Sequence, residues 1–334
     1  MSCLCWLDIL SESVFVLAFD LRVDRIVAAA IGLGGEVLAH IQRPRSNGPY
    51  PVEKAIATIL DETDELFEAL PTGALWAGVG IAVPGVVETE LGFVRKAPNL
   101  GWIDLPFGEL IHSAIKEHFG VCPRVVLGND ANLGAIAEYV RGAATAASSV
   151  VYLSGDVGVG GGVVLGGQVL AGGSGYAGEL GHLVVNPHGQ PCACGSKGCW
   201  ETEVGRDAIL GAAGFNLGQD SFPELLDAAK NDPEGMAVKL MEVGEWVGVG
   251  LVNLMNSIDP NYIVLGGHLA EIYPYINEVV ERRISQSRPN IKTRANISLP
   301  SLPLDSPLVG AAEMAFGPLL LDPLQHVEQI YSLV

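Results

Sequence analysis

The chain has 334 residues, 49% of them hydrophobic and 17% charged, which excludes long disorder and predicts two domains or two lobes of one duplicated fold. Its net charge of −19 at pH 7 disfavours binding to nucleic acid or to anionic lipid, because an acidic surface repels phosphates. The densest basic stretch, residues 282–294, is interpreted as a solvent-exposed face. No apolar run approaches the ~20 residues of a membrane helix and Met1 to Leu10 lacks the basic start of a secretory signal, so we expect a cytoplasmic protein without membrane contact.

The first predicted elements are a β-hairpin, a helix and a buried strand. Residues 14–19 and 26–31 are apolar runs of strand length around a polar turn. Residues 51–70 carry apolar side chains at helical spacing after an initial proline. Residues 79–83 predict a strand that ends in the turn dipeptide Pro84-Gly85.

A second helix, a strand and a third helix follow. They are predicted at residues 105–119, 125–127 and 131–141, the last one starting after Gly128-Asn129-Asp130. By themselves, Asn129 and Asp130 are either a plain helix cap or a pair that binds adjacent hydroxyl groups, since an amide donates and a carboxylate accepts.

A second hairpin is predicted where residues 150–153 and 163–165 flank a glycine-rich turn. Gly34 to Ala39 is echoed by Gly166 to Ala171, about 130 residues later, which indicates internal duplication. The later helices and one strand, which complete an α/β pattern, are predicted at residues 206–213, 223–229, 237–256, 262–265 (the strand) and 307–316.

His182, Cys192, Cys194 and Cys199 have the composition and spacing of a zinc site. Three thiolates and an imidazole suit tetrahedral zinc, and a filled set of four ligands predicts a structural ion. The alternative is a group of buried, unpaired thiols, which the turn residues packed between the cysteines disfavour. The cysteines without such a pattern are expected to be ordinary: Cys3, Cys5 and Cys122.

When one ring nitrogen of a histidine binds a metal, the other nitrogen is held in an orientation that suits one hydrogen-bond partner. For His182 that partner is either a backbone carbonyl or a ligand hydroxyl. Glu179, three residues earlier, favours the ligand.

Five segments, in order, resemble the signatures of the ROK family, which holds bacterial sugar kinases, chiefly glucokinases and fructokinases, and sugar-responsive transcriptional repressors. They are Val79-Gly-Ile-Ala-Val-Pro-Gly85, Gly128-Asn-Asp-Ala-Asn132, Gly178-Glu-Leu-Gly-His182, Cys192-Ala-Cys-Gly-Ser-Lys-Gly-Cys-Trp-Glu201 and Asp259-Pro-Asn-Tyr-Ile-Val-Leu-Gly-Gly267. The resemblance spans roughly residues 14–316, and the zinc motif is highly specific.

The resemblance implies an actin-like (ribonuclease-H-like) duplicated fold with a ligand cleft between two lobes, usually in a homodimer or homotetramer. The smaller lobe would comprise residues 14–127 plus 306–330, and the larger lobe, with the zinc loop, residues 128–305. The residues that would line the site for a monosaccharide are Gly85, Asn129, Asp130, Glu179, His182 and Glu201. In the family's kinases the aspartate matching Asp130 is the general base on the sugar hydroxyl.

Two loops depart from the family's kinases. Those kinases hold ATP phosphates with Asp-x-Gly-Gly-Thr, whose glycines let backbone N–H groups approach the anion. Here the segment is Asp20-Leu-Arg-Val-Asp24-Arg25, which looks like the corresponding segment of the repressors. The second kinase loop reads Gly-Thr-Gly, whereas this chain has Asp156-Val157-Gly158. Loss of phosphate contacts in both loops is difficult to reconcile with a conventional ATP-dependent kinase.

Three functions stay open. We favour a sugar sensor, the effector-binding part of a ROK transcriptional regulator. The alternatives are an ATP-dependent hexose kinase that uses magnesium, and a structural zinc protein with a vestigial cleft. In a kinase the nucleotide would lie at Asp20, Gly158, Gly160, Gly266 and Gly267. About 13 residues precede the first predicted strand, too few for the repressors' winged helix-turn-helix, so we expect no DNA binding by this chain alone.

Overall fold

The computed structural model describes residues 13–324, except residues 47, 174, 218–220 and 288–294. These residues divide into two compact units: one holds the chain up to Leu133 together with the chain from Pro307 on, and the other is Gly134–Ser306. Among the described helices, none has the length and apolar character needed to cross a membrane. The expectations that lie outside the described residues concern Cys3, Cys5, Met1 to Leu10, residues 288–294 and residues 325–330.

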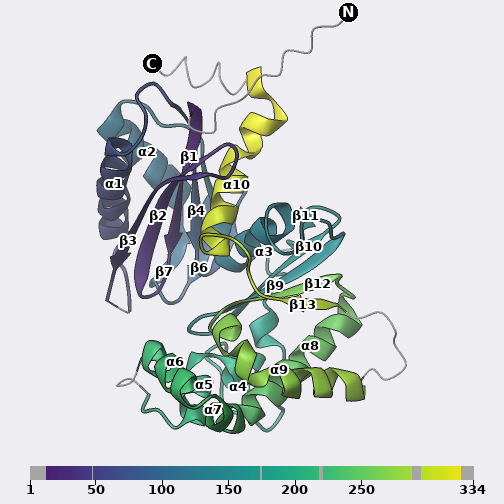
Figure 1. Ribbon diagram of the computed structural model, residues 1–334. Helices are drawn as coiled ribbons and strands as arrows, with labels where there is room; N and C mark the ends of the chain where they lie inside the picture. The colour runs from purple at the N-terminus through teal and green to yellow at the C-terminus, as the bar shows by residue number, and fades with distance from the viewer. Residues whose placement is uncertain (1–12, 47, 174, 218–220, 288–294, 325–334) are drawn as a thin grey trace, which may run out of the picture. The chain divides into compact units, whose positions relative to one another are not determined.

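A five-stranded sheet forms the centre of the first unit (Figure 1). Its order is β3-β2-β1-β4-β8, and its strands are β1 (Val14–Leu21), β2 (Arg25–Gly32), β3 (Val37–Pro44), β4 (Leu75–Val83) and β8 (Val125–Asn129). β1, β2 and β3 are antiparallel neighbours, whereas β4 and β8 run parallel to β1. The strands β1, β2 and β4 are buried along almost their whole length, because they are continuous apolar runs in the middle of the sheet.

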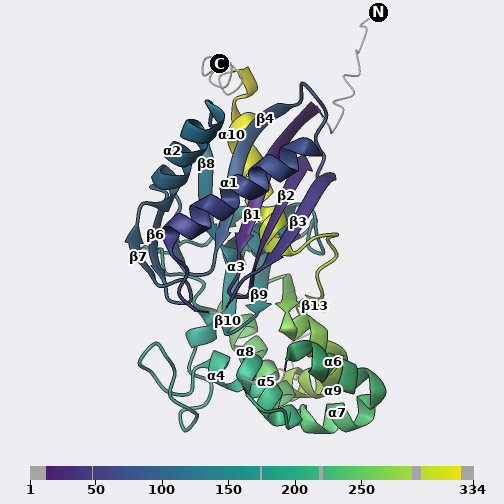
Figure 2. The ribbon, with the colours of Figure 1, turned by 90° about the vertical axis from the view of Figure 1, so that its left-hand side faces the viewer.

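Helices cover both faces of this first sheet (Figure 2). α1 (Val52–Glu68) and α2 (Phe107–Phe119) lie on one face, and α10 (Ser306–Leu321) lies on the other. α10 comes close to β4 because Gly80 has no side chain: a Cβ there would lie 2.0 Å from the carbonyl oxygen of Ala311.

The second unit repeats the same sheet topology. Its order is β11-β10-β9-β12-β13, from β9 (Ser149–Gly155), β10 (Val159–Leu165), β11 (Gln168–Val169), β12 (Tyr262–Gly267) and β13 (Asn296–Ser298). Again the first three strands are antiparallel neighbours and the last two run parallel to the central strand. The α/β class and the duplication predicted from the two hairpins are therefore confirmed.

Six of the described helices pack around the apolar core of the second unit. They are α4 (Trp200–Val204), α5 (Arg206–Ala213), α6 (Phe222–Asn231), α7 (Pro233–Lys239), α8 (Met241–Ser257) and α9 (His268–Ser287). The single helix predicted at residues 237–256 is wrong, because α7 ends at Lys239 and α8 begins at Met241. An Asp232 cap and Pro233 start α7 as a separate helix, with the side chain of Asp232 accepting from the backbone N–H of Gly235.

Several elements were not predicted, namely β3, β11, β13, α4, α9 and a small sheet in the first unit. α9 is mostly polar and buries only about one side chain per turn, namely Leu269, Ile272, Ile276, Val280 and Ile284. The first unit also holds a small antiparallel sheet of β5 (Val86–Glu88), β6 (Phe93–Ala97) and β7 (Trp102–Leu105). Such short, partly charged strands carry a weak sequence signal.

Candidate functional site

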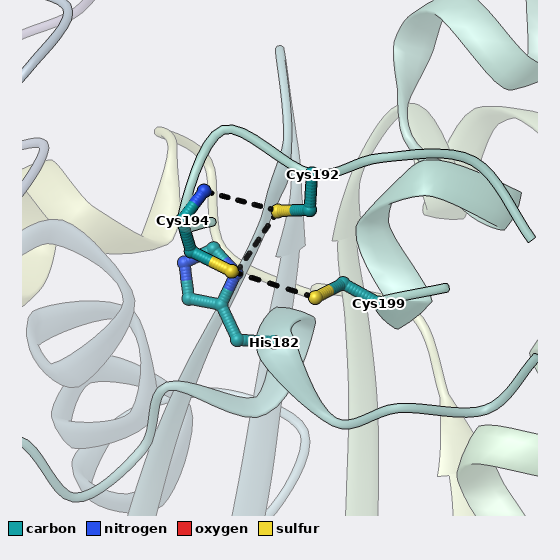
Figure 3. A group of neighbouring side chains, drawn as sticks. All are labelled: His182, Cys192, Cys194 and Cys199. Carbon is teal, nitrogen blue, oxygen red and sulfur yellow. Dashed lines mark hydrogen bonds between the residues drawn. The ribbon is translucent and has the colours of Figure 1, made fainter. Parts of the chain in front are cut away.

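Three cysteines and one histidine of the second unit lie together (Figure 3). His182 ends the short 3-10 helix Leu180–His182, Cys192 and Cys194 lie in the loop that follows, and Cys199 directly precedes α4. Their ligand atoms all lie within 4.8 Å of one another. The four residues that were expected to bind a metal therefore converge on one point.

The donor set fits a tetrahedral zinc ion. Zinc bonds of ~2.3 Å to sulfur and ~2.0 Å to nitrogen separate neighbouring donors by roughly 3.5–3.8 Å. The Sγ atoms of Cys194 and Cys199 are 3.6 Å apart, and Sγ of Cys192 lies 3.6 Å from Nδ1 of His182. This group can bind a metal ion, and with four ligands it would leave no open position for a reacting water.

The three thiols differ in their local environment. Burial raises the pKa of Cys192 and of Cys199. A hydrogen bond from the backbone N–H of Ser196 lowers the pKa of Cys194. A bound cation would favour the thiolate form of all three, because metal ligation requires deprotonated sulfur.

A glycine closes the loop that carries these thiols. Gly198 has a φ of +69°, and a Cβ there would lie 1.6 Å from the carbonyl oxygen of Asn186. The carbonyl oxygen of Gly198 accepts hydrogen bonds from the backbone N–H groups of Val185 and Asn186, at 3.0 and 3.2 Å. The start and the end of the loop are therefore joined by backbone hydrogen bonds, one residue before Cys199.

Two carboxylates flank the imidazole of His182. Oε1 of Glu201 lies 3.3 Å from Nδ1 and accepts a 2.8 Å hydrogen bond from Sγ of Cys192. Oε2 of Glu179 lies 3.6 Å from Nε2. Nδ1 therefore lies on the side of the thiols, and Nε2 lies on the side of Glu179. The carboxylates are accessible, with 45% of the Glu179 side chain and 21% of the Glu201 side chain exposed.

A second group of expected ligand residues lies in the first unit, where β8 ends and α3 (Asp130–Val140) begins. The Nδ2 group of Asn129 donates to the carbonyl oxygen of Gly85 at 2.9 Å and to Oδ1 of Asp130 at 3.1 Å. Oδ1 of Asn129 accepts from the backbone N–H of Asn132 at 3.0 Å, so Asn129 does cap the helix. Gly85, Asn129 and Asp130 form one contiguous group.

Sequence reasoning did not single out Asn132. Its Oδ1 is buried and has no hydrogen-bond partner among the described residues, which leaves an acceptor for a water or for a ligand donor. Its position three residues after Asn129 puts both amides near one face of the helix start, and that spacing was the available signal.

The turn between β1 and β2 is held by its own charged side chains. Asp20 is only 2% exposed, and its Oδ2 accepts a 2.7 Å hydrogen bond from Nε of Arg22. Nε of Arg45 donates to the carbonyl oxygen of Arg22 at 2.7 Å, and Asp24 pairs with Arg25 at 2.9 Å. The carboxylate of Asp20 is therefore already compensated by a cation.

The remaining residues that were implied for a nucleotide lie in the second unit: Gly158 directly before β10, Gly160 within it, and Gly266 and Gly267 at the end of β12. Beside them, Nδ1 of His268 lies 2.8 Å from Oε2 of Glu271, and Nε2 of His268 lies 4.0 Å from Oδ1 of Asp156. The ring of His268 also stacks on Phe222 at 3.6 Å. The two carboxylates would repel a phosphate group placed next to them.

Comparison with known proteins identifies relatives of two kinds. The model of the ROK family matches residues 16–317. The chain is 28% identical to a xylose repressor of Bacillus spizizenii, over 90% of this chain and 76% of the repressor. It is 27% identical to a glucokinase of Streptomyces coelicolor, over 91% of this chain and 98% of the glucokinase. Among solved structures, a ROK family glucokinase from Streptomyces griseus in complex with glucose and AMPPNP has a TM-score of 0.75 at 25% identity, covering 90% of this chain and 98% of that one.

Proposed function

The chain belongs to the ROK family, and on that basis we propose that it is a sugar-binding regulator, a sensor that binds a monosaccharide without phosphorylating it. The relatives of this chain include both repressors and glucokinases. The choice between a regulator and a kinase therefore depends on the residues that this chain has at the sugar and phosphate positions. A sugar acts as a signal when it binds one conformational state more tightly than another, which requires a sugar site but no nucleotide.

The observation that carries this proposal is the ion pair between Asp20, near the end of β1, and Arg22, in the turn that leads to β2. The family's kinases have glycines two and three residues after the aspartate that matches Asp20, and these glycines expose backbone N–H groups to phosphate. Here the residues at and after those positions are Arg22, Val23 and Asp24, which have side chains, and the carboxylate of Asp20 is paired. Such a turn lacks the backbone cradle that phosphoryl transfer needs.

The residues proposed to bind sugar supply hydrogen-bond donors and acceptors for hydroxyl groups. The carboxylates of Asp130, Glu179 and Glu201 accept and Nε2 of His182 donates, while Oδ1 of Asn129 keeps a second lone pair that can accept from a hydroxyl. Gly85 belongs to the proposed site through the hydrogen bond from Asn129 to its carbonyl oxygen. A structural zinc ion on His182 and the three cysteines would fix the orientation of the imidazole.

Asp130→Asn is expected to weaken sugar binding about 30-fold, because a hydrogen bond to a charged group contributes about 2 kcal/mol. Isothermal titration of zinc-replete protein with glucose, N-acetylglucosamine and xylose measures the change. Asp24→Asn, the same substitution at a residue paired with Arg25, serves as the control and should leave affinity unchanged. Equal affinity in the Asp130→Asn and unchanged proteins would contradict the assignment of Asp130.

The second candidate is an ATP-dependent hexose kinase with magnesium and with Asp130 as general base. The glucokinase of Streptomyces coelicolor, matched over 98% of its length, favours it. A coupled assay with ATP, magnesium and a panel of hexoses is expected to show no turnover above background. Turnover that the Asp130→Asn substitution removes would overturn the sensor in favour of the kinase. If no sugar gives heat in calorimetry and no hexose turns over, a structural zinc protein is left.

A further inference from the structure

The backbone at Gly158 directly faces the carboxylate of Glu201. A Cβ on Gly158 would lie 2.5 Å from Oε2 of Glu201. The other carboxylate oxygen, Oε1, lies 2.8 Å from Sγ of Cys192 and 3.3 Å from Nδ1 of His182. One carboxylate is therefore confined between two members of the metal-binding group and the bare backbone before β10.

Two further glycines, Gly161 on β10 and Gly181 in the short helix that ends at His182, also leave no room for a side chain. A Cβ on Gly161 would lie 2.7 Å from the carbonyl oxygen of Gly178, and a Cβ on Gly181 would lie 2.0 Å from the carbonyl oxygen of Val159. β10 and the segment that ends at His182 thus pack backbone against backbone. At Gly158 and Gly161, the glycine run that resembles a phosphate loop therefore faces Glu201 and the segment that ends at His182.

We propose that Gly158 is a positioning residue for Glu201: its lack of a side chain sets where the carboxylate lies and so sets the affinity for sugar. This inference rests on the proposed sugar-binding function. It also gives the β9–β10 turn a role that needs no nucleotide, because the turn then acts on the ligand through Glu201.

The position of the clash makes this proposal testable without unfolding the protein. The atom that an alanine at position 158 would meet is the end of a flexible side chain, so the carboxylate of Glu201 can move while the backbone stays in place. At Gly181 the same substitution would meet a backbone carbonyl, which cannot move without distorting β10. Gly158→Ala should therefore change ligand binding and leave stability nearly unchanged.

We expect Gly158→Ala to weaken sugar binding about tenfold, the size of a weakened hydrogen bond to a charged group, with zinc content and Tm unchanged. Gly211→Ala on α5 is the matched control, because a Cβ there meets nothing within 4 Å. In a Glu201→Ala background, Gly158→Ala should change affinity by less than about twofold, since a residue that acts only through Glu201 has nothing left to position. Additive losses, or a loss of Tm that accounts for the effect, would overturn the proposal.

A second readout does not depend on sugar. Cobalt bound in place of zinc absorbs visible light according to its thiolate and imidazole ligands and to the groups that contact them. With Glu201 displaced from Cys192 and His182, the spectrum of Gly158→Ala protein should shift toward that of Glu201→Ala protein, while Gly211→Ala leaves it unchanged. If the unchanged protein binds no sugar, the proposed function fails but the cobalt spectra still decide the role of Gly158. Identical spectra in Gly158→Ala and unchanged protein would refute the positioning role.

Discussion

We expect Cys199→Ser to remove the zinc ion and to weaken sugar binding by more than about 100-fold, because structural zinc contributes about 10–16 kcal/mol to the order of the segment that it holds. The Sγ atom of Cys199 is buried and lies 3.6 Å from Sγ of Cys194, so its loss leaves three donors. Glu201 follows two residues later, and its carboxylate contacts both Cys192 and His182. The loop that places these groups is rich in glycine and has little core of its own. Elemental analysis gives the zinc content, and calorimetry gives the affinity.

Cys122→Ser is the control for this loss. Cys122 is buried in the first unit, and burial raises the pKa of its thiol to about 12, so it is an inert structural thiol. The substitution should keep one zinc ion per chain and full sugar affinity. Removal of zinc from the unchanged protein with a chelator should reproduce the Cys199→Ser result. If the metal-free protein still binds sugar with full affinity, the metal does not support the sugar site and this prediction is wrong.

The metal-binding group was predictable because it is local. Cys192, Cys194 and Cys199 lie within eight residues of sequence, and their sulfurs lie together with the imidazole of His182 in the structure. The central strands were predictable for a similar reason. Residues 14–19 and 26–31 are uninterrupted apolar runs, and the observed β1 and β2 extend them by only one or two residues at most ends.

Contacts between distant residues were not predictable in the same way. The hydrogen bond from Arg45 to the carbonyl oxygen of Arg22, 23 residues earlier, depends on β3 running back along β2. The approach of Gly158 to Glu201 depends on the folded metal loop as well as on the β9–β10 turn. No local sequence pattern predicts either contact, because each depends on how several elements are aligned in the folded chain. Motif resemblance pointed to Gly158 as a phosphate-loop residue, whereas its contact with Glu201 exists only in the folded structure.

Buried charge gave no sequence signal either, and Glu62 on α1 illustrates this. It reads as one acid of a solvated helix, yet the side chain is 0% exposed and neither carboxylate oxygen has a hydrogen-bond partner among the described residues. Arg43 on β3 comes within 3.7 Å of it, but 47% of the Arg43 side chain is in solvent and it also pairs with Glu65. Burial raises the pKa of Glu62 to about 7, while Arg43 acts in the opposite direction and Glu65 and Asp61 add to the rise.

Glu62→Gln should therefore stabilise the protein above pH 7 by about 3 kcal/mol and change little below pH 4.5, since each pKa unit corresponds to about 1.4 kcal/mol. The sign follows from proton binding. Between the ordinary pKa of 4.5 and the folded value of about 7, the folded state keeps a proton that the unfolded state has released, so stability falls as pH rises through this window. The glutamine variant has no carboxyl to titrate and should lose this slope. Urea unfolding at pH 4.5, 6 and 8 measures it, with Glu65→Gln at the exposed neighbour as the control. A gain of the same size at all three pH values would mean that packing, rather than the buried charge, limits stability at Glu62.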